Sequence, residues 1–200
     1  MTAAGALDRR AVVARLLADR DDDLLVVTGL GSTAWDATAA GDHDATFPLW
    51  GAMGGAASIG LGLALARPDR RVLVVTGDGE ALMGLGSLST IGRMQPANLA
   101  LAVIDNGHYG ETGMQPTHTN RADGGRTDLA AVAAACGWLV AVTVTAEAQL
   151  ADAVDAARHQ PGPVFLTVAV SADPVPLVLP PRDGHHLAAR FRRHLGVTPL

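Results

Sequence analysis

The chain has a single cysteine, Cys136, so a framework of disulfides within the chain is excluded. It also lacks an excess of basic residues, because the 200 residues carry a net charge of −5 and a pI of about 5.7. Nucleic-acid-binding proteins need a basic field, so that class is excluded. The first ten residues lack the apolar core of a signal peptide, which leads us to expect a cytoplasmic protein.

Two common catalytic motifs are also missing from the chain. It contains no Gly-Lys-Ser/Thr phosphate loop and no Gly-x-Ser-x-Gly nucleophile elbow. Residues 45–66 carry no charge and so resemble a membrane span, but they include Pro48 and five glycines. Because no second such stretch occurs, we expect a loop and a buried helix here, and no membrane protein.

Short apolar runs alternate along the chain with segments of helical spacing. With 48% hydrophobic and 18% charged residues, the composition is typical of a folded domain. The alternation predicts an α/β fold, a doubly wound and mostly parallel sheet with helices on both faces. The expected helices lie at 7–17, 53–66, 80–94, 128–136, 147–158 and 187–195, and the expected strands at 24–27, 71–76, 99–105, 139–144 and 164–170.

We expect one domain over residues 1–200, with its core at about 7–170 and an extended tail at 171–200 that carries the last helix. Residues 106–126 are predicted to be a long polar loop. The basic cluster at 190–193 is expected to face solvent, with subunit contact as the alternative. Three large apolar side chains are expected in the core, namely Met83, Met94 and Trp138.

A glycine-rich turn, Gly29-x-Gly31-x-x-Ala34, follows the first strand and opens a short helix. It fits part of the dinucleotide fingerprint, which also needs an acidic residue about 20 positions further on. Residues 45–55 contain no acid, so a simple NAD site is disfavoured. The turn either presents N–H groups and the hydroxyls of Ser32 and Thr33 to a phosphate or is an ordinary tight turn.

Two neighbouring apolar runs each end in an oxygen-bearing side chain beside glycine. Gly77-Asp78-Gly79 follows the run at 71–76, and Asn106-Gly107 follows the run at 99–105. Parallel strands end at the same edge of a sheet, where ligands of open α/β sheets bind. Asp78 and Asn106 are therefore expected to share one hard cation, and magnesium prefers such oxygen ligands together with phosphate oxygens.

The spacing of these residues also carries a family resemblance. Gly77-Asp78-Gly79, 26 intervening residues and Asn106 resemble the cofactor signature of thiamine diphosphate enzymes. Asp105 replaces the first residue of that family's usual Asn-Asn pair, of which only the second is a ligand. Residues 51–60 and 104–117 resemble the sulfopyruvate and phosphonopyruvate decarboxylase branch, and the whole resemblance covers about residues 24–170.

The resemblance implies a role for individual residues. Magnesium would be held by Asp78, Asn106 and the backbone carbonyl of His108. Met53 would be the apolar wedge that bends the cofactor, and the carbonyl of Gly51 would accept a hydrogen bond from its aminopyrimidine. The carboxylate of Glu80 would have to point away from the diphosphate. The residues implied to hold the diphosphate are Gly31, Ser32, Thr33, Gly77, Gly79, Glu80, Tyr109 and Gly110.

The resemblance further implies that the chain is a half-site. In this family a glutamate from a pyrimidine-binding domain activates the cofactor, and this chain has no room for that domain. We therefore expect a hetero-oligomer with a pyrimidine-binding partner, acting on a small anionic 2-oxoacid. No cluster of arginines is evident near the site, so the partner is expected to bind the substrate's anionic group. Glu111 is either a proton carrier or an exposed loop carboxylate.

Three alternatives stay open at this point. The same cofactor could support carboligation, as in acetolactate synthases. The chain could be a non-catalytic binding subunit, although the Asp78 and Asn106 pair argues against that. It could also be a plain nucleotide-binding domain that uses the Gly29-x-Gly31 turn.

Overall fold

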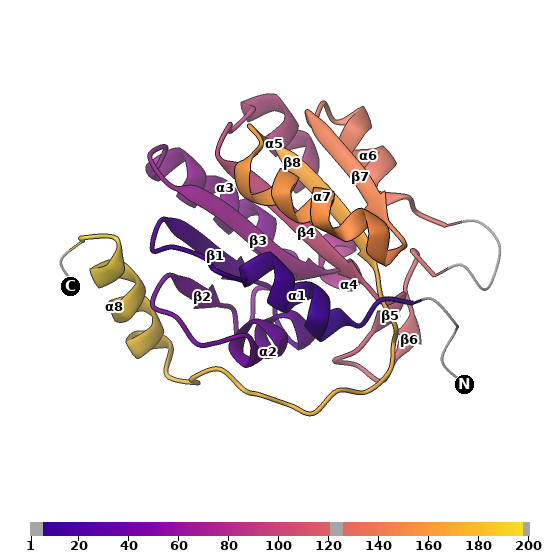
Figure 1. Cartoon of the computed structure of the whole chain (residues 1–200), viewed down its shortest axis with the longest axis horizontal. Helices are drawn as coiled ribbons and strands as arrows, with labels where there is room; N and C mark the ends of the chain where they lie inside the picture. Colours follow the sequence, from indigo (N-terminus) through magenta and orange to yellow (C-terminus); the bar gives the residue numbers. More distant parts are fainter. Residues whose placement is uncertain (1–5, 121–125, 198–200) are drawn as a thin grey trace.

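The computed structural model describes residues 6–120 and 126–197, which form a six-stranded parallel sheet in the order β2-β1-β3-β4-β8-β7 (Figure 1). This confirms the predicted α/β fold. Residues 1–5, 121–125 and 198–200, which include the ends of the predicted loop and tail, lie outside the described residues. The strands of this sheet are β1 (Leu24–Thr28), β2 (Thr46–Pro48), β3 (Arg71–Gly77), β4 (Leu99–Asp105), β7 (Val140–Val144) and β8 (Val164–Ala169).

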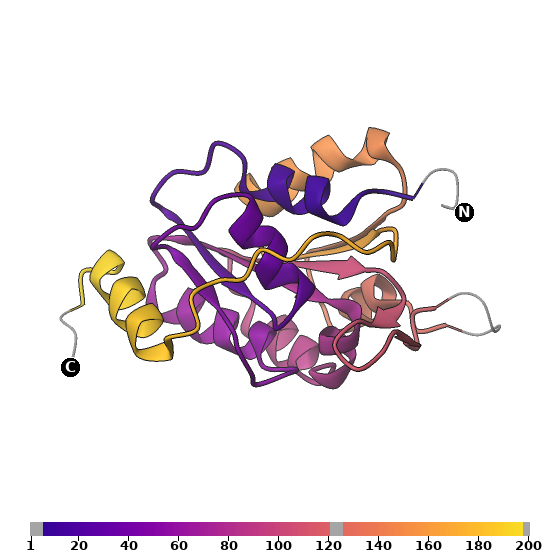
Figure 2. The same cartoon turned by 90° about the horizontal axis from the view of Figure 1, so that it is seen from below.

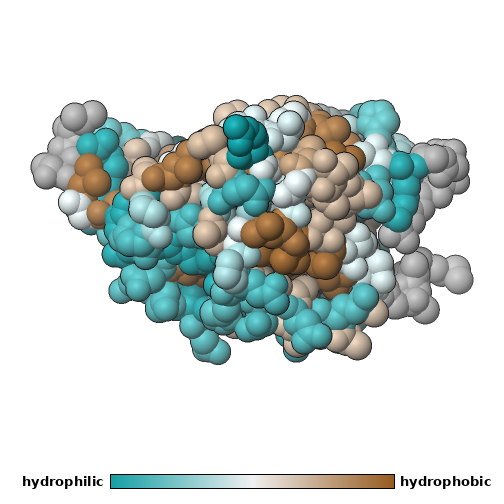
Figure 3. Space-filling model, turned by 90° about the horizontal axis from the view of Figure 1, so that it is seen from above, coloured by the Kyte–Doolittle hydropathy of each residue, from teal (hydrophilic) through white to brown (hydrophobic). Residues whose placement is uncertain are grey.

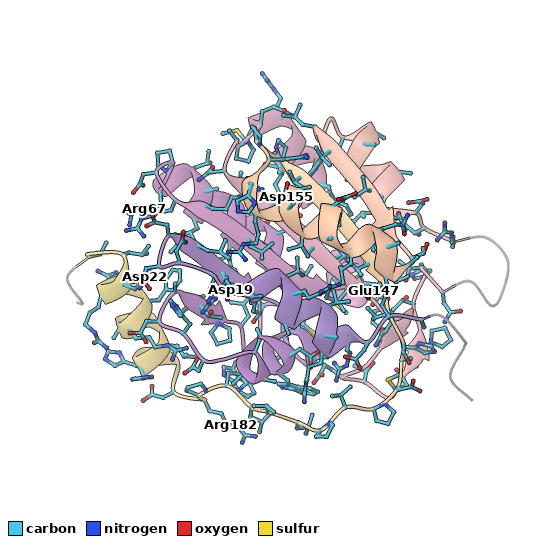
Figure 4. The ribbon with its side chains drawn as sticks, in the orientation of Figure 1. Asp19, Asp22, Arg67, Glu147, Asp155 and Arg182 are labelled. Atoms are coloured by element: carbon cyan, nitrogen blue, oxygen red, sulfur yellow. The ribbon has the colours of Figure 1, made fainter. Side chains whose placement is uncertain are left out.

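Helices cover both faces of the sheet (Figure 2). One face is covered by α1 (Arg9–Leu17), α2 (Ser32–Ala39) and α7 (Glu147–His159), and Arg15 of α1 pairs with Glu147 at the start of α7 (Figure 4). The other face is covered by α3 (Ala56–Ala66), α5 (Ser87–Met94), α6 (Leu129–Ala135) and α8 (Gly184–His194).

Successive side chains of the central strands point to opposite faces of the sheet and so contribute to the hydrophobic core on each face. In β3, Leu73 and Val75 pack on the side of α1 and α7, whereas Val72 and Val74 pack on the side of α3. A strand buried on both faces needs an unbroken apolar run, which is why the sequence revealed these strands so clearly. Aspartate side chains cap the N-termini of three helices, and Asp8 accepts a hydrogen bond from the N–H of Ala11 at 2.7 Å.

The predicted helix at 80–94 is wrong as a single helix. The structure has α4 (Asp78–Met83) and α5, separated by Gly84-Leu85-Gly86. The break brings Gly84 against the backbone of Gly54, where a Cβ on Gly84 would overlap the Gly54 carbonyl oxygen. Correspondingly, the helix predicted from residue 53 begins three residues later, at Ala56, because residues 51–55 form the turn that meets Gly84.

The polar segment after β4 is more ordered than predicted. It contains the two-stranded antiparallel hairpin β5 (His108–Tyr109) and β6 (Gln115–Pro116), in which Tyr109 pairs with Gln115. Gly107, with φ +69°, makes the turn that leads into the hairpin. The hairpin stands beside α4 at the carboxyl end of the sheet, so residues 108–116 frame the site that is described below.

The tail returns across the domain before it forms α8 (Figures 1 and 2). Arg10 donates to the carbonyl of Pro176 at 2.6 Å, and the indole N–H of Trp50 donates to the carbonyl of Pro181 at 2.8 Å. Arg182 extends from this tail with its guanidinium 5.5 Å from the Trp50 ring centroid (Figure 4). The tail therefore contacts both α1 and the segment that follows β2.

The expectation that the basic cluster faces solvent is wrong for Arg190. This residue is buried on α8, and its guanidinium makes two hydrogen bonds to the Asp42 carboxylate, at 2.6 and 2.8 Å. The hydrogen bonds from the Arg190 guanidinium hold the pKa of the Asp42 carboxyl below its usual range. Phe191 adds an aromatic contact with Phe47 of β2, so α8 docks on the first strand of the sheet order.

Of the three large apolar side chains expected in the core, one is buried. Trp138 is buried and donates its indole N–H to the carbonyl of Leu88 at 3.0 Å. Met83 and Met94 are wrong as core residues, because about half of each side chain is exposed at the end of its helix. Figure 3 shows apolar areas on one face of the molecule. No helix within the described residues is long and apolar enough to span a membrane.

Gly60 and Gly62 of α3 give a matched test of the packing. A Cβ on Gly60 would overlap Cγ2 of Val74, whereas a Cβ on Gly62 would meet open space. We expect Gly60→Ala to lower the free energy of unfolding by about 1–3 kcal/mol through overpacking. Gly62→Ala should raise it, by up to about 1 kcal/mol, because alanine favours the helix. Denaturant unfolding measures both, and equal stabilities of the two variants would contradict this packing.

Candidate functional site

The predicted metal ligands lie together at the carboxyl edge of the sheet. Asp78 follows β3 and Asn106 follows β4, and these strands are direct neighbours with Gly77 in register with Ile104. Both residues line one cavity that is open to solvent. The strand-end argument therefore placed two residues, 28 positions apart in the sequence, on one cavity.

Most of the predicted site residues contribute to the wall of this cavity. Gly31, Thr33 and Gly51 are the predicted residues that do not line it. The hydroxyl of Thr33 donates to the carbonyl of Gly29 at 3.2 Å, and its contact with a phosphate stays a prediction. The predicted residues that line the cavity are Ser32, Met53, Gly77, Asp78, Gly79, Glu80, Asn106, His108, Tyr109, Gly110 and Glu111.

Asp78 is a buried carboxylate that is 2% exposed. Its Oδ2 accepts a hydrogen bond from the Thr117 hydroxyl at 2.6 Å, and the Thr119 hydroxyl lies 3.1 Å away. The Thr119 hydroxyl also lies 2.7 Å from Oδ1 of Asp105. Burial, with a smaller contribution from the charge of Asp105, raises the pKa of Asp78 to about 6.

Asn106 is held by a local turn. Its Oδ1 accepts a hydrogen bond from the backbone N–H of His108 at 2.9 Å, and the ring Nδ1 of His108 lies 2.8 Å from the Asn106 carbonyl oxygen. The His108 ring therefore braces the turn, which leaves its backbone carbonyl as the group implied to bind a metal. This is an Asx-type turn, a conformation that asparagine and glycine favour.

The donor set fits magnesium better than a softer metal. Within residues 6–120 and 126–197, no group of three His, Cys, Asp or Glu side chains could hold a metal by itself. Asp78 has hydroxyl donors but no basic side chain paired with it in this part of the chain. A buried carboxylate without a counter-ion, an amide oxygen and a nearby carbonyl are hard oxygen donors, which magnesium completes with phosphate and water.

Gly79 provides a close approach on the cavity wall. The Tyr109 ring packs on it, and a Cβ at this position would lie 2.6 Å from Cδ1 of the ring. Any larger residue would displace Tyr109 from the wall. The second glycine of Gly77-Asp78-Gly79 is therefore required by the packing of the hairpin against α4.

The Glu80 carboxylate reaches both the start of α3 and the glycine-rich turn after β1. Its Oε1 accepts a hydrogen bond from the N–H of Ala56 at 3.3 Å, at the first turn of α3. Its Oε2 lies where a side chain on Gly29 would be, so Gly29 leaves the space that Glu80 fills. Burial raises the pKa of Glu80. Because Gly29 belongs to the predicted phosphate-binding turn, the expectation that this carboxylate points away from the diphosphate stays a prediction.

Glu111 lies on the exposed hairpin, but its side chain reaches back to the glycine-rich turn. A Cβ on Gly31, which has φ +85°, would overlap the Glu111 carboxylate. Partial burial raises the pKa of Glu111, and the nearby positive charge of Arg9 opposes that rise. A proton-carrying role for Glu111 stays a prediction.

Met53 stands at the mouth of the cavity and is 52% exposed. It lies in a tightly wound turn, in which Ala52 and Gly54 have φ of +56° and +88°. Exposure of a large apolar side chain at a cavity mouth suits contact with a ligand or with another subunit. The wedge role of Met53 and the carbonyl role of Gly51 stay predictions.

Arg9 is the site residue that sequence reasoning missed. It is 8% exposed, it lines the cavity, and its Nη1 lies 3.3 Å from Oδ2 of the fully buried Asp36. The sequence predicted no cluster of arginines near the site, and Arg9 is a single arginine on the cavity wall. Helical spacing carried the signal, because Arg9, Val12, Val13 and Leu16 share the buried face of α1.

The site and fold match known proteins. Residues 31–168 match the family described as thiamine pyrophosphate enzyme, C-terminal TPP binding domain. Phosphonopyruvate decarboxylase from Streptomyces viridochromogenes is 39% identical over 192 residues, which are 96% of this chain and 47% of that protein. Sulfopyruvate decarboxylase subunit beta from Methanothermobacter thermautotrophicus is 34% identical over 187 residues, which are 92% of this chain and 94% of that subunit.

A solved structure extends the match to the fold. An X-ray structure from Mycobacterium smegmatis, described as a thiamin diphosphate-dependent enzyme, superposes with a TM-score of 0.70 and 25% identity, over 86% of this chain and 33% of that one. The chain spans about half the length of the phosphonopyruvate decarboxylase, but nearly all of the beta subunit. The chain belongs to the family of C-terminal TPP-binding domains of thiamine pyrophosphate enzymes.

Proposed function

We propose that the chain is the diphosphate-binding subunit of a thiamine diphosphate- and magnesium-dependent 2-oxoacid decarboxylase of the sulfopyruvate or phosphonopyruvate type. The observation that carries this proposal is the placement of Asp78 and Asn106 at the ends of adjacent strands on one cavity. The similarity to decarboxylases named for these two substrates supports the substrate class.

In this proposal, the chain's own residues bind and orient. The Asp78 carboxylate, the Asn106 amide oxygen and the His108 carbonyl hold magnesium, which in turn holds the diphosphate. The backbones of Gly31 and Thr33, together with the cavity-lining segments, contribute N–H groups to the phosphate oxygens. The cavity-lining residues proposed to hold the diphosphate are Ser32, Gly77, Gly79, Glu80, Tyr109 and Gly110.

The chemical step lies at the mouth of the cavity. When bound, thiamine diphosphate supplies a thiazolium ring that takes up the electron pair left as carbon dioxide departs. Met53 would support the cofactor's rings as an apolar wedge, and the carbonyl of Gly51 would accept a hydrogen bond from the aminopyrimidine. Glu111 would carry a proton, and the partial burial that raises its pKa supports this role.

A partner subunit completes the site in this proposal. We propose that a pyrimidine-binding partner supplies the glutamate that activates the cofactor. The relative that this chain spans almost entirely is named as a beta subunit, which supports a two-subunit assembly. The exposed Met53 and Met83 at the cavity suit burial by such a partner.

Calorimetry with purified chain separates this proposal from its alternatives. We expect thiamine diphosphate to bind only with magnesium present, and NAD not to bind. A chelator should remove magnesium and thereby release the cofactor. Two or three of the ligands of magnesium come from the chain, so the metal joins the cofactor to the chain. NAD binding without magnesium-dependent binding of thiamine diphosphate would identify a plain nucleotide-binding domain instead.

A further inference from the structure

One wall of the cavity carries a positive charge that the proposed function does not use. The Arg9 guanidinium is nearly inaccessible to solvent and lines the cavity together with Ser32 and Glu111. Desolvating a guanidinium is costly unless it is paired, and here its partner is Asp36 at 3.3 Å. A buried positive charge on the wall of a ligand-binding cavity is expected to bind an anion.

Asp36 pairs with two guanidinium groups. Besides Arg9, it pairs with Nε of Arg10 at 3.1 Å. Arg10 directs its Nη2 to the carbonyl of Pro176 in the tail and does not line the cavity. Of the two arginines, Arg9 is therefore the one that can reach a ligand in the cavity, where the Glu111 carboxylate now lies near it.

The contacts of Arg9 show at which end of the cavity its guanidinium lies. Ser32 and Asp36 are four residues apart on α2, so they lie on one face of the helix. Bound to Asp36, the Arg9 guanidinium lies beside the first turn of α2 and the predicted phosphate-binding turn. Met53, where the cofactor's rings are expected, lies on the separate turn before α3.

An anionic group already lies in this corner of the cavity. The Glu111 carboxylate rests against Gly31, and the positive charge of Arg9 is close enough to oppose the rise in its pKa. The corner thus already holds one negatively charged oxygen group near Arg9. Glu111 belongs to an exposed hairpin, so its side chain can leave the corner when another anion enters.

We propose that Arg9 donates hydrogen bonds to the terminal phosphoryl group of thiamine diphosphate, with Asp36 holding the guanidinium in position. This inference rests on the proposed function and deepens it by adding a cofactor-binding residue outside the family signature. Arginine suits this role because its fork of N–H donors matches phosphate oxygens and its charge is permanent.

The test compares Arg9→Gln with Arg10→Gln, since both variants remove one positive charge and one ion pair to Asp36. Calorimetry with magnesium, on the full chain together with the subunit that copurifies with it, gives the affinities for thiamine diphosphate and thiamine monophosphate. We expect Arg9→Gln to weaken thiamine diphosphate binding by about 10- to 100-fold. Thiamine monophosphate, which lacks the terminal group, should bind to wild type and Arg9→Gln within about threefold.

Arg10→Gln should leave the affinity for thiamine diphosphate within about threefold of wild type. Arg9→Lys, which keeps the charge but not the fork, should give an intermediate affinity and covers the case in which Arg9→Gln does not fold. Thermal unfolding of both glutamine variants checks that they lose similar stability by losing a partner of Asp36.

Three results would overturn the assignment. Equal affinities of Arg9→Gln and Arg10→Gln for thiamine diphosphate would show that Arg9 does not touch the terminal phosphoryl group. Unchanged cofactor affinity with a raised KM for phosphonopyruvate or sulfopyruvate, but not for pyruvate, would place Arg9 on the substrate. Absence of magnesium-dependent cofactor binding in the wild type would reject the proposed function itself.

Discussion

Asp78→Ala should abolish magnesium-dependent binding of thiamine diphosphate in the assembled complex while leaving the fold intact. Asp78 is the one carboxylate in the expected metal set, and its loss leaves an amide oxygen and a carbonyl to hold a divalent cation. We expect the affinity to fall by more than about 100-fold, beyond the loss that removal of an outer contact causes. Calorimetry measures the affinity, and circular dichroism checks the fold.

The matched control for this prediction is Asp105→Asn. It changes the neighbouring carboxylate, which shares the Thr119 hydroxyl with Asp78, and creates the Asn-Asn pair usual in the family. We expect cofactor binding to persist in this variant. Wild-type affinity in Asp78→Ala would place the metal elsewhere, and equal losses in both variants would mean that the effect is not specific to Asp78.

The metal-free protein offers a second readout for Asp78. Burial raises the pKa of its carboxyl from 3.8 to about 6, so the folded state binds the proton more tightly than the unfolded state does. The resulting stability is fully present below about pH 4 and is lost as pH rises through 6, by about 3 kcal/mol at most. With chelator present, Asp78→Asn should lack this loss, and the two proteins should differ in stability at pH 8 but not at pH 4.

The chain purified by itself should decarboxylate no 2-oxoacid. In the proposed function, this chain binds the diphosphate and a pyrimidine-binding partner supplies the glutamate that activates the cofactor. We expect turnover to appear only when the partner is added, and to saturate at a fixed ratio of the two chains. Carbon dioxide release from a panel of 2-oxoacids, including sulfopyruvate, phosphonopyruvate and pyruvate, measures this directly.

The panel also addresses the alternative reaction. Formation of a longer hydroxy-keto acid from two substrate molecules would indicate carboligation in place of simple decarboxylation. Full turnover by the isolated chain would refute the half-site proposal. A chain that binds cofactor and partner but supports no turnover on any 2-oxoacid would be a binding subunit without catalytic function.

The sequence predicted the sheet and the edge that carries the expected metal ligands, because both depend on local patterns. Strands buried on both faces need continuous apolar runs, and parallel strands bring their last residues to one edge. Those two rules were enough to place Asp78 beside Asn106. They require no knowledge of how the helices pack.

The features that the sequence did not reveal depend on contacts between distant segments. The helix break at Gly84 depends on the approach of Gly54, thirty residues earlier in the chain. The cavity position of Arg9 depends on α1 packing beside α2, where Asp36 fixes the guanidinium. Met83 is apolar, but only the orientation of α4 decides that it faces the cavity mouth.

The two edges of the sheet differ in how readily they could pair with a strand from another molecule. The β2 edge is three residues long, ends at Pro48 and is covered by α8, and each of these features opposes pairing with a foreign strand. The β7 edge is longer, and Val142 within it and Leu139 beside it are exposed. Self-association by sheet extension would therefore begin at β7, at the opposite end of the sheet from the docked α8.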